Sequence, residues 1–263
     1  MKATHSVFPA TTAAGIELQL VAAAREIADG ELVFAGTPLA RVAFQLAKLI
    51  HAPRAVALHE SGVVRDHPAP APLLSLVDPP NLSGASMLAD LQGVMSLLQQ
   101  GRVDLGLLEA DEVDRFGNLS SASGSAADIA CLARRTVILI RHQPHLLCER
   151  VLQVTGPGHS DGHGDGDGWR RRVGLTGGGP AAIITDLAVL RFHANGEAYL
   201  ASVHPGVTTA EVRARTGWKL QPGEVPVTPP PSTQERNWLA EIDPERSLTG
   251  GLRNAASGQG EEV

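Results

Sequence analysis

The sequence predicts an α/β protein built on an open, mostly parallel sheet flanked by helices. Short apolar runs of strand length alternate with stretches in which apolar residues recur at helical spacing. The clearest run, residues 136–140, reads TVILI and has the continuous apolar character of a strand buried on both faces. Alternating strands and helices favour a parallel sheet, because a helix carries the chain back to the start of the next strand.

The N-terminal third predicts a helix over residues 15–29 that stops where Gly30 can adopt a left-handed conformation. A short buried strand over 31–36 follows, and helical spacing resumes over 38–50. A second apolar run over 55–59 completes the order strand, helix, strand. This order predicts a βαβ unit.

The remaining elements follow from the same periodicities. A helix is predicted over 87–100, and a glycine-dense surface loop over 156–168. Ala194-Asn195-Gly196 predicts a hairpin turn. The strands predicted in this part of the chain cover residues 103–108, 136–140, 181–185, 188–192 and 197–203.

At 263 residues and 27.5 kDa the chain has the length of one large α/β domain. Hydrophobic residues make up 43% and charged residues 19%, an ordinary globular composition. We predict an N-terminal extension over 1–14 and a single domain over 15–245. The tail 246–263 carries almost nothing to bury and is predicted to be disordered.

Composition also excludes several partners. A net charge of −6 and a pI of about 5.9 give no basic surface for nucleic acid. The apolar stretches are too short for a membrane helix. The two cysteines, Cys131 and Cys148, form no disulfide framework, so a reduced compartment, the cytoplasm, is expected.

Glu60 is the candidate for chemistry that position alone suggests. It follows an apolar strand at a glycine-bearing turn, and ligands of open α/β sheets bind outside the carboxyl ends of the strands. A carboxylate held there can attack a thioester carbonyl and form an acyl anhydride. From spacing alone, a solvated residue at a strand end is the alternative.

Residues 36–62, GTPLARVAFQLAKLIHAPRAVALHESG, resemble the β subunit of the glutaconate-type (family I) coenzyme A transferases. That family has a Gly-Thr-Gly-like turn, a helix, an Ala-Pro break, a strand and then Glu-Ser-Gly. Further segments resemble the family in the same order and extend the likeness to about residues 15–245. They are residues 113–118, 184–189, 204–208 and 216–218.

The resemblance implies that Glu60 is the covalent nucleophile of a ping-pong reaction, moving coenzyme A from an acyl-CoA to a free carboxylic acid. It implies no tightly bound cofactor and no metal, with coenzyme A as a substrate. It also implies a homologous α-type partner subunit in an α2β2 assembly, without which this chain is inactive. Dicarboxylic acids are the family's usual substrates.

The chain departs from the family pattern at two places. The turn reads Gly36-Thr37-Pro38, and proline lacks the backbone N–H that a glycine would offer to an oxyanion. The family's glycine-rich loop is represented by residues 122–130, in which few glycines remain. Oxyanion or coenzyme A contacts are predicted from small residues of both segments, namely Gly36, Thr37, Ser123, Gly124, Ser125 and Ala126; an ordinary tight loop is the alternative for 123–126.

These departures leave two rival functions open. Relatives with this fold include acyl-CoA hydrolases and decarboxylases that lack the nucleophilic glutamate, and the chain could instead be a non-catalytic partner subunit in which Glu60 is a relic. The presence of Glu60 in Glu-Ser-Gly argues against the first rival.

Four further features are assigned structural roles. Residues 177–179 are read as a turn, and the arginines 170–172 as a solvated run rather than a phosphate site. His59 and His204 are read as structural. The alternating loop residues His159, Asp161, His163, Asp165 and Asp167 lack the spacing of a metal site.

Overall fold

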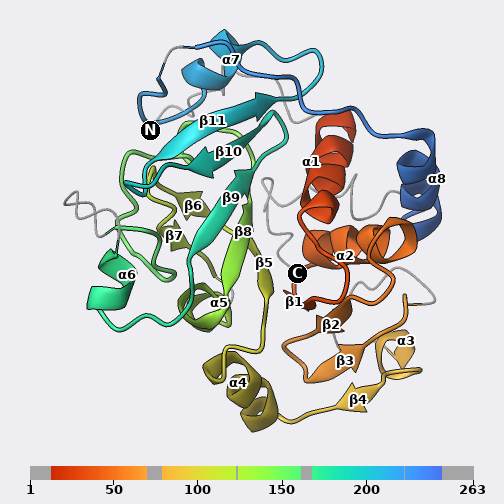
Figure 1. The fold of residues 1–263 in the computed structure, drawn as a ribbon. Coiled ribbons are helices and arrows are strands. Elements are labelled where there is room, and N and C mark those ends of the chain that lie inside the picture. Colours follow the sequence, from red (N-terminus) through yellow and green to blue (C-terminus); the bar gives the residue numbers. More distant parts are fainter. Residues whose placement is uncertain (1–12, 70–78, 123, 161–167, 222, 245–263) are drawn as a thin grey trace, which may run out of the picture.

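The computed structural model describes residues 13–69, 79–122, 124–160, 168–221 and 223–244. In these ranges a nine-stranded sheet with the order β11-β10-β9-β8-β5-β1-β2-β3-β4 forms the centre of the fold (Figure 1). A separate two-stranded sheet pairs β6 (Glu112–Val113) with β7 (Leu119–Ser120).

Five neighbouring strands in the middle of the sheet run parallel, which confirms the predicted architecture. They are β1 (Leu32–Ala35), β2 (Val56–Leu58), β5 (Leu105–Glu109), β8 (Arg135–Leu139) and β9 (Pro180–Ile184). Antiparallel pairs extend both edges. These edge strands are β10 (Ala188–Phe192) and β11 (Ala198–Val203) on one side, and β3 (Val63–Arg65) and β4 (Met87–Leu88) on the other.

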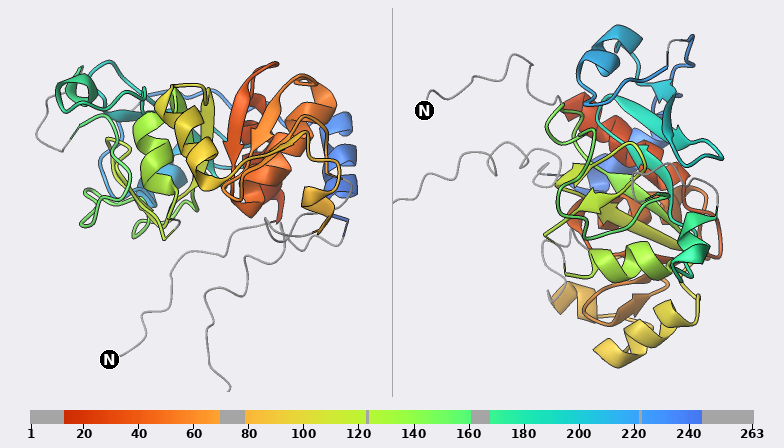
Figure 2. Two further views of the ribbon diagram at one scale, coloured as in Figure 1. Left: turned by 90° about the horizontal axis from the view of Figure 1, so that it is seen from below. Right: turned by 90° about the vertical axis from the view of Figure 1, so that its left-hand side faces the viewer.

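Helices cover both faces of the sheet, so each central strand is buried on two sides. One face carries α1 (Ala13–Arg25), α2 (Pro38–Ile50) and α8 (Thr233–Ile242); Figure 2 shows α8, in blue, beside the orange α2. The other face carries α4 (Leu91–Gln99) and α5 (Ala126–Leu132). The shorter helices are α3 (Pro79–Leu82), α6 (Trp169–Arg172) and α7 (Thr209–Ala214).

Strand β8 shows how the sequence produces these two cores. Val137 and Leu139 pack into the core under α1 and α2, whereas Ile138 packs into the core under α5, because successive strand side chains point to opposite faces. Both faces are apolar, which accounts for the uninterrupted TVILI pattern. In the described part of the chain, no helix is long and apolar enough to cross a membrane.

The predicted βαβ unit is present as β1, α2 and β2, with β1 and β2 paired in parallel. Helix α1 ends at Arg25, earlier than the predicted 15–29. The amides of Glu26 and Ile27 bond carbonyls only three residues back, so the chain leaves the helix through a tightened turn. Gly30 has φ +86°, as expected for the glycine that ends this segment.

The helix predicted over 87–100 is wrong at its start. Met87 and Leu88 form β4 and pair with β3, and α4 begins only at Leu91. Asp90 sets this boundary, because its side chain accepts a hydrogen bond of 2.8 Å from the backbone N–H of Gly93. The other predicted strands lie at or beside their predicted positions. The proposed ends of the domain stay predictions, because most of residues 1–14 and all of 246–263 lie outside the described ranges.

The strand order reverses at β1. The chain first adds β2, β3 and β4 on one side of β1, and then returns to place β5, β8 and β9 on its other side. The carboxyl ends of β1 and β5 therefore flank a topological switch point, where open α/β sheets bind ligands.

Candidate active site

A cavity of about 210 Å³ lies at this switch point. It brings together five of the seven residues predicted from the sequence, Gly36, Thr37, Glu60, Ser125 and Ala126. Gly36 and Thr37 follow β1, and Glu60 follows β2. Ser125 lies directly before α5, and Ala126 is the first residue of that helix. The remaining lining residues are Phe34, Pro38, Leu107, Leu108, Glu109 and Ile129.

Glu60 lies in the tight turn that joins β2 to the antiparallel strand β3. The backbone N–H of His59 bonds the Val63 carbonyl at 2.9 Å, and the N–H of Gly62 bonds the His59 carbonyl at 2.9 Å. Gly62 has φ +84°, and a Cβ added there would lie 1.8 Å from the Ala89 carbonyl oxygen. Only glycine fits this position, so the Glu-Ser-Gly motif holds an exposed carboxylate on a fixed turn.

Ser125 is the polar side chain that reaches Glu60. Its Oγ–H donates to Glu60 Oε2 at 3.1 Å across the cavity. Ser125 precedes α5 but makes no side-chain cap bond to that helix. The hydroxyl therefore helps to orient the Glu60 carboxylate.

The Gly36-Thr37-Pro38 turn also lines the cavity. Pro38 is the first residue of α2, a position at which the missing N–H costs no helical hydrogen bond. Thr37 Oγ1 is buried and has no hydrogen-bond partner among the described residues. A buried hydroxyl without a partner is unfavourable, so this atom is a candidate contact for a bound ligand.

Glu109 also lines the cavity, and the sequence reasoning missed it. It is the last residue of β5, and its Oε1 accepts a hydrogen bond of 3.0 Å from the Leu39 N–H in the first turn of α2. The signal was present in the sequence, because LGLLE is an apolar strand that ends on a carboxylate, as is the run before Glu60.

His59 has the structural role predicted for it. Its ring is 3% exposed, and Nδ1 donates to the Ala35 carbonyl at 2.7 Å, which ties the end of β2 to the end of β1. Burial lowers the pKa of His59 to about 4, with the positive charges of Arg41 and Arg65 acting in the same direction. The ring is therefore neutral near pH 7.

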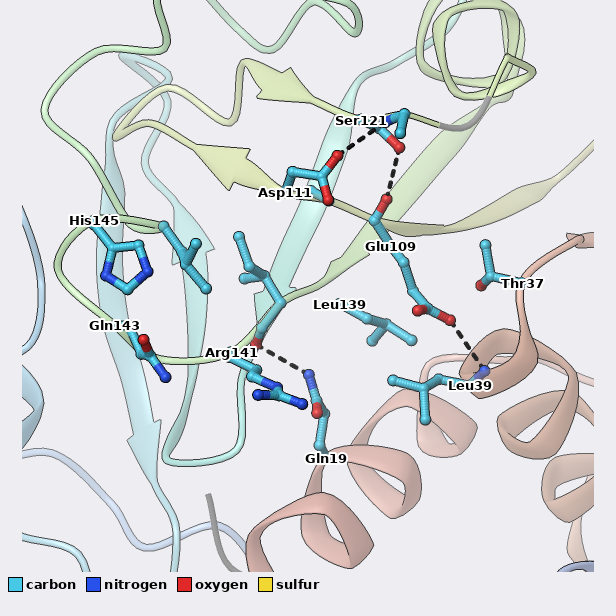
Figure 3. A pocket seen from close by; sticks show the side chains of 14 residues that line it. Gln19, Thr37, Leu39, Glu109, Asp111, Ser121, Leu139, Arg141, Gln143 and His145 are labelled. Carbon is cyan, nitrogen blue, oxygen red and sulfur yellow. Dashed lines mark hydrogen bonds between the residues drawn. The ribbon is translucent and has the colours of Figure 1, made fainter. Parts of the chain in front are cut away.

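A second, larger cavity of about 550 Å³ adjoins the first, and Thr37 and Glu109 line both (Figure 3). Its lining also includes Arg141, Gln143 and His145, from the segment that follows β8. Sequence reasoning did not single out these residues.

The other predicted contacts differ in their outcome. Gly124 does not line either cavity. Ser123 and residues 161–167 of the predicted loop lie outside the described ranges.

The solvated reading of residues 170–172 is wrong for Arg170. Its side chain is 7% exposed and donates to several backbone carbonyls, including those of Ala130, Pro157 and Gly177. Arg170 thus holds the loop before β9 against α5. Gly177 permits the backbone of this loop to approach the end of α5 closely. A Cβ at this position would lie only 2.6 Å from the Cys131 carbonyl oxygen, so a larger residue does not fit.

His204 is 1% exposed, with Nδ1 3.0 Å from Thr228 Oγ1 and Nε2 3.0 Å from the Thr185 carbonyl. Both contacts support the structural reading. His159, the described member of the alternating loop residues, has Nε2 2.6 Å from the Pro180 carbonyl and packs edge-on against Phe192. Among the described residues, no group of three or more His, Cys, Asp or Glu side chains could hold a metal ion.

Neither cysteine lines the Glu60 cavity. Both are free thiols, and burial raises the pKa of Cys148 to about 11 and that of Cys131 above its ordinary value. Both thiols therefore stay protonated near pH 7, and neither is placed to act as a nucleophile at this cavity.

No family model matches the chain. Among curated proteins, it is 34% identical over 221 residues to the β subunit of the 3-oxoadipate CoA-transferase of Pseudomonas knackmussii, an alignment covering 78% of this chain and 83% of that protein. The chain belongs to the coenzyme A transferase family, among the β subunits. It is also 27% identical over 225 residues to the β subunit of the glutaconate CoA-transferase of Acidaminococcus fermentans, covering 78% and 82% of the two chains.

Solved structures agree with this assignment. The glutaconate coenzyme A-transferase from Acidaminococcus fermentans superposes with a TM-score of 0.81 and 25% identity, covering 92% of this chain and 99% of that chain. The decarboxylase AibA/AibB superposes with a TM-score of 0.74 and 28% identity, covering 95% and 100%. The resemblance identified from the sequence motifs is thus confirmed at the level of family and fold.

Proposed function

We propose that this chain is the β subunit of a transferase that moves coenzyme A between an acyl-CoA and a free carboxylic acid through a thioester on Glu60. The observation that supports this most is the position of Glu60. An exposed carboxylate follows a parallel strand, contacts the Ser125 hydroxyl and lines a cavity at the topological switch point.

The reaction begins when a carboxylate oxygen of Glu60 attacks the thioester carbonyl of the donor. The C–S bond breaks, coenzyme A leaves as the thiolate, and an acyl-glutamyl anhydride forms. The thiolate then attacks the Glu60 carbonyl carbon, which releases the first acid and leaves a glutamyl-CoA thioester. The acceptor carboxylate repeats the two steps in reverse order, so charges and atoms balance without a redox or metal group.

The small residues around Glu60 supply the surroundings for these steps. The small side chains of Gly36, Thr37, Ser125 and Ala126 line the cavity and leave room for a tetrahedral intermediate. The hydroxyl groups of Thr37 and Ser125 are donors for its oxyanion or for coenzyme A. Residues 123–124, which precede Ser125 in the sequence, are further candidate contacts for coenzyme A.

The active form pairs this chain with an α-type subunit in an α2β2 assembly. Two observations support a partner: the curated relatives are β subunits, and the decarboxylase AibA/AibB is named as a pair of chains. We place the assembled enzyme in the cytoplasm and assign it no resident cofactor.

Exchange of label tests this function. The assembled enzyme, given an acyl-CoA and the same acid in labelled form, should move label into the acyl-CoA without any second acid, because each half-reaction is complete in a ping-pong mechanism. Consumption of acyl-CoA with release of free coenzyme A or carbon dioxide, and without exchange, would replace the transferase by a hydrolase or decarboxylase.

A further inference from the structure

The N-cap side chains of the helices differ in what they bond. A serine, threonine or aspartate at this position ordinarily accepts a hydrogen bond from a backbone N–H in the first turn of its own helix. Three N-cap side chains do so, at 2.8 Å for Asp90 in α4 and at 3.1 Å for both Thr208 in α7 and Ser232 in α8. Thr37 of α2 and Ser125 of α5 make no such bond, and both line the smaller cavity.

The backbone of Thr37 has the geometry of an ordinary N-cap residue. Its φ of −87° and ψ of 160° are extended, and its carbonyl accepts the first helical hydrogen bond of α2, from the Arg41 N–H at 3.0 Å. The side chain nevertheless leaves Oγ1 buried and without a hydrogen-bond partner among the described residues. Another group must therefore satisfy the start of this helix.

Glu109 supplies the missing cap. Pro38 is the first residue of α2 and has no backbone N–H, so the Leu39 N–H is the first in the helix that needs an acceptor. Glu109 Oε1 accepts this bond at 3.0 Å from the end of the neighbouring strand β5. A carboxylate is well suited to this place, because the N-terminus of a helix carries partial positive charge. The N–H that a capping threonine would bond is thus already taken.

The backbone around Glu109 is itself fixed. Ser121 Oγ–H donates to the Glu109 carbonyl at 3.0 Å, and the Ala110 N–H bonds the Leu139 carbonyl at 3.2 Å. Figure 3 shows Glu109 between its bonds to Ser121 and to the Leu39 N–H, while no bond is drawn to Thr37. The cap from β5 is therefore formed before any substrate binds, and Thr37 Oγ1 remains available to the cavity.

We propose that Glu109 is a positioning residue that caps α2 in place of Thr37, which leaves the Thr37 hydroxyl to stabilise the oxyanion formed when Glu60 attacks a thioester. This inference rests on the proposed function, because it requires that attack. As the new C–O bond forms, the electron pair of the carbonyl moves to its oxygen, and Thr37 Oγ–H donates a hydrogen bond to that oxygen without transferring its proton. The hydroxyl thereby replaces the backbone N–H that Pro38 lacks.

The two uncapped hydroxyls then have separate roles. Ser125 bonds the Glu60 carboxylate at 3.1 Å and acts on the nucleophile. Thr37 has no partner among the described residues, so it gives up no hydrogen bond within the protein when it bonds the oxyanion. Its contribution therefore appears in the transition state and not in the binding of the thioester.

The first test measures how fast coenzyme A is attached to Glu60 in the assembled enzyme. Acetyl-CoA, butanoyl-CoA and succinyl-CoA are compared, and the thioester that wild type consumes fastest is used. Thr37→Val keeps the shape of the side chain and should lower this rate about 100-fold with little change in KM. Thr37→Ser keeps the hydroxyl and should recover most of the rate. Equal rates for Thr37→Val and wild type would overturn the assignment of the donor.

Variants of Glu109 test the positioning role. In Glu109→Ala the Thr37 side chain is expected to turn to the Leu39 N–H and cap α2, so the rate should fall about as far as in Thr37→Val. Glu109→Gln keeps an oxygen that accepts this N–H and should retain most of the rate. The double variant Thr37→Val/Glu109→Ala should be no slower than Glu109→Ala alone. Losses that multiply in the double variant would mean that the two residues act independently, which contradicts the positioning role.

Melting temperatures supply a readout that a merely structural role would not produce. Thr37→Val should leave the melting temperature of wild type unchanged or raise it, because it removes a buried hydroxyl without a partner among the described residues. In the Glu109→Ala background the same change should lower it by about 2 to 4 °C, because Thr37 is then the cap. Equal shifts in the two backgrounds would contradict the exchange of caps.

The matched control is Thr208→Val, at an exposed threonine that caps α7 and lines neither cavity. It should lower the melting temperature and leave the rate per folded enzyme at the wild-type value.

Peptide mass spectrometry separates this inference from the proposed function. If wild type attaches coenzyme A to Glu60 and Thr37→Val does so equally fast, only the roles given to Thr37 and Glu109 fail. If wild type forms no adduct at Glu60 with any of the three thioesters, the proposed function fails, and this inference fails with it.

Discussion

Two polar clusters lie at the same carboxyl edge of the parallel strands and differ in how their polar atoms are used. Around His142 the hydrogen-bonding atoms are buried and paired: the ring contacts Thr185 Oγ1 at 2.9 Å and Thr216 Oγ1 at 3.0 Å. Around Glu60 the carboxylate is exposed at a cavity, and Thr37 Oγ1 has no partner among the described residues. Position at the strand ends makes both clusters candidates for chemistry, but only the second leaves groups available to a substrate.

The largest expected effect is on the Glu60 side. Glu60→Gln keeps the size of the side chain and removes the nucleophile, so turnover of the assembled enzyme should fall about a thousandfold or more. The melting temperature should stay close to that of wild type, because the residue is exposed. Glu241→Gln, on the exposed side of α8, is the matched control and should retain full turnover.

The His142 cluster should respond in the opposite way. His142→Ala removes the contacts of the buried ring with Thr185 Oγ1 and Thr216 Oγ1 and leaves a cavity, which should lower the free energy of unfolding by about 3 kcal/mol. Turnover of acyl-CoA per folded enzyme should change little. Thermal unfolding and active-site titration measure the two effects; a loss of chemistry with unchanged stability would move the catalytic centre to His142.

Acid should destabilise both regions through their buried histidines. Burial holds the pKa of both His59 and His142 at about 4, below the ordinary value of 6.5. The unfolded chain therefore takes up protons on these rings between about pH 6.5 and 4, while the folded protein does not. As the pH is lowered through this window, the free energy of unfolding decreases by up to about 3 kcal/mol per ring.

His142→Gln removes one of these two titrations, and its unfolding free energy should depend less steeply on pH than that of wild type between pH 6.5 and 4. Burial raises the pKa of Asp114, which acts in the opposite direction but is common to both proteins. Equal slopes for the two proteins would mean that the pKa of His142 is the same in the folded and unfolded states and would contradict the lowered value.

The smallest effect is expected at the contact that orients the nucleophile. Ser125→Ala removes the 3.1 Å hydrogen bond to Glu60 Oε2 and should lower kcat about tenfold. Ser125→Thr keeps a hydroxyl and should recover part of the rate. Ser96→Ala, at a half-buried serine of α4 that lines neither cavity, is the control; equal rates for the two alanine variants would remove Ser125 from the site.

Local patterns predicted the part of the fold that carries Glu60. The β1-α2-β2 unit follows from apolar periodicity and from glycines at its turns, which are properties of neighbouring residues. Helix α8 was missed although its start was readable: Ser232 and Glu235 form a capping box, with Ser232 Oγ accepting from the Glu235 N–H at 3.1 Å. The three prolines at 229–231 directly before it are typical of a loop and not of a helix.

The second cavity could not be predicted from local patterns. Glu109 and Arg141 are separated by a long stretch of sequence and line one cavity because β5 pairs with β8. Arg170 was misread for the same reason, since its carbonyl partners come from distant segments. Tertiary packing decides whether a charged residue is solvated, structural or part of a site.

The central claim is that Glu60 carries coenzyme A during turnover. The direct measurement is peptide mass spectrometry of the assembled enzyme after incubation with acyl-CoA thioesters, performed on wild type and Glu60→Gln. The account predicts a coenzyme A adduct on the peptide that contains Glu60 in wild type, and none in the variant. Acyl-CoA consumed by wild type without an adduct, or with the adduct on another residue, would contradict it.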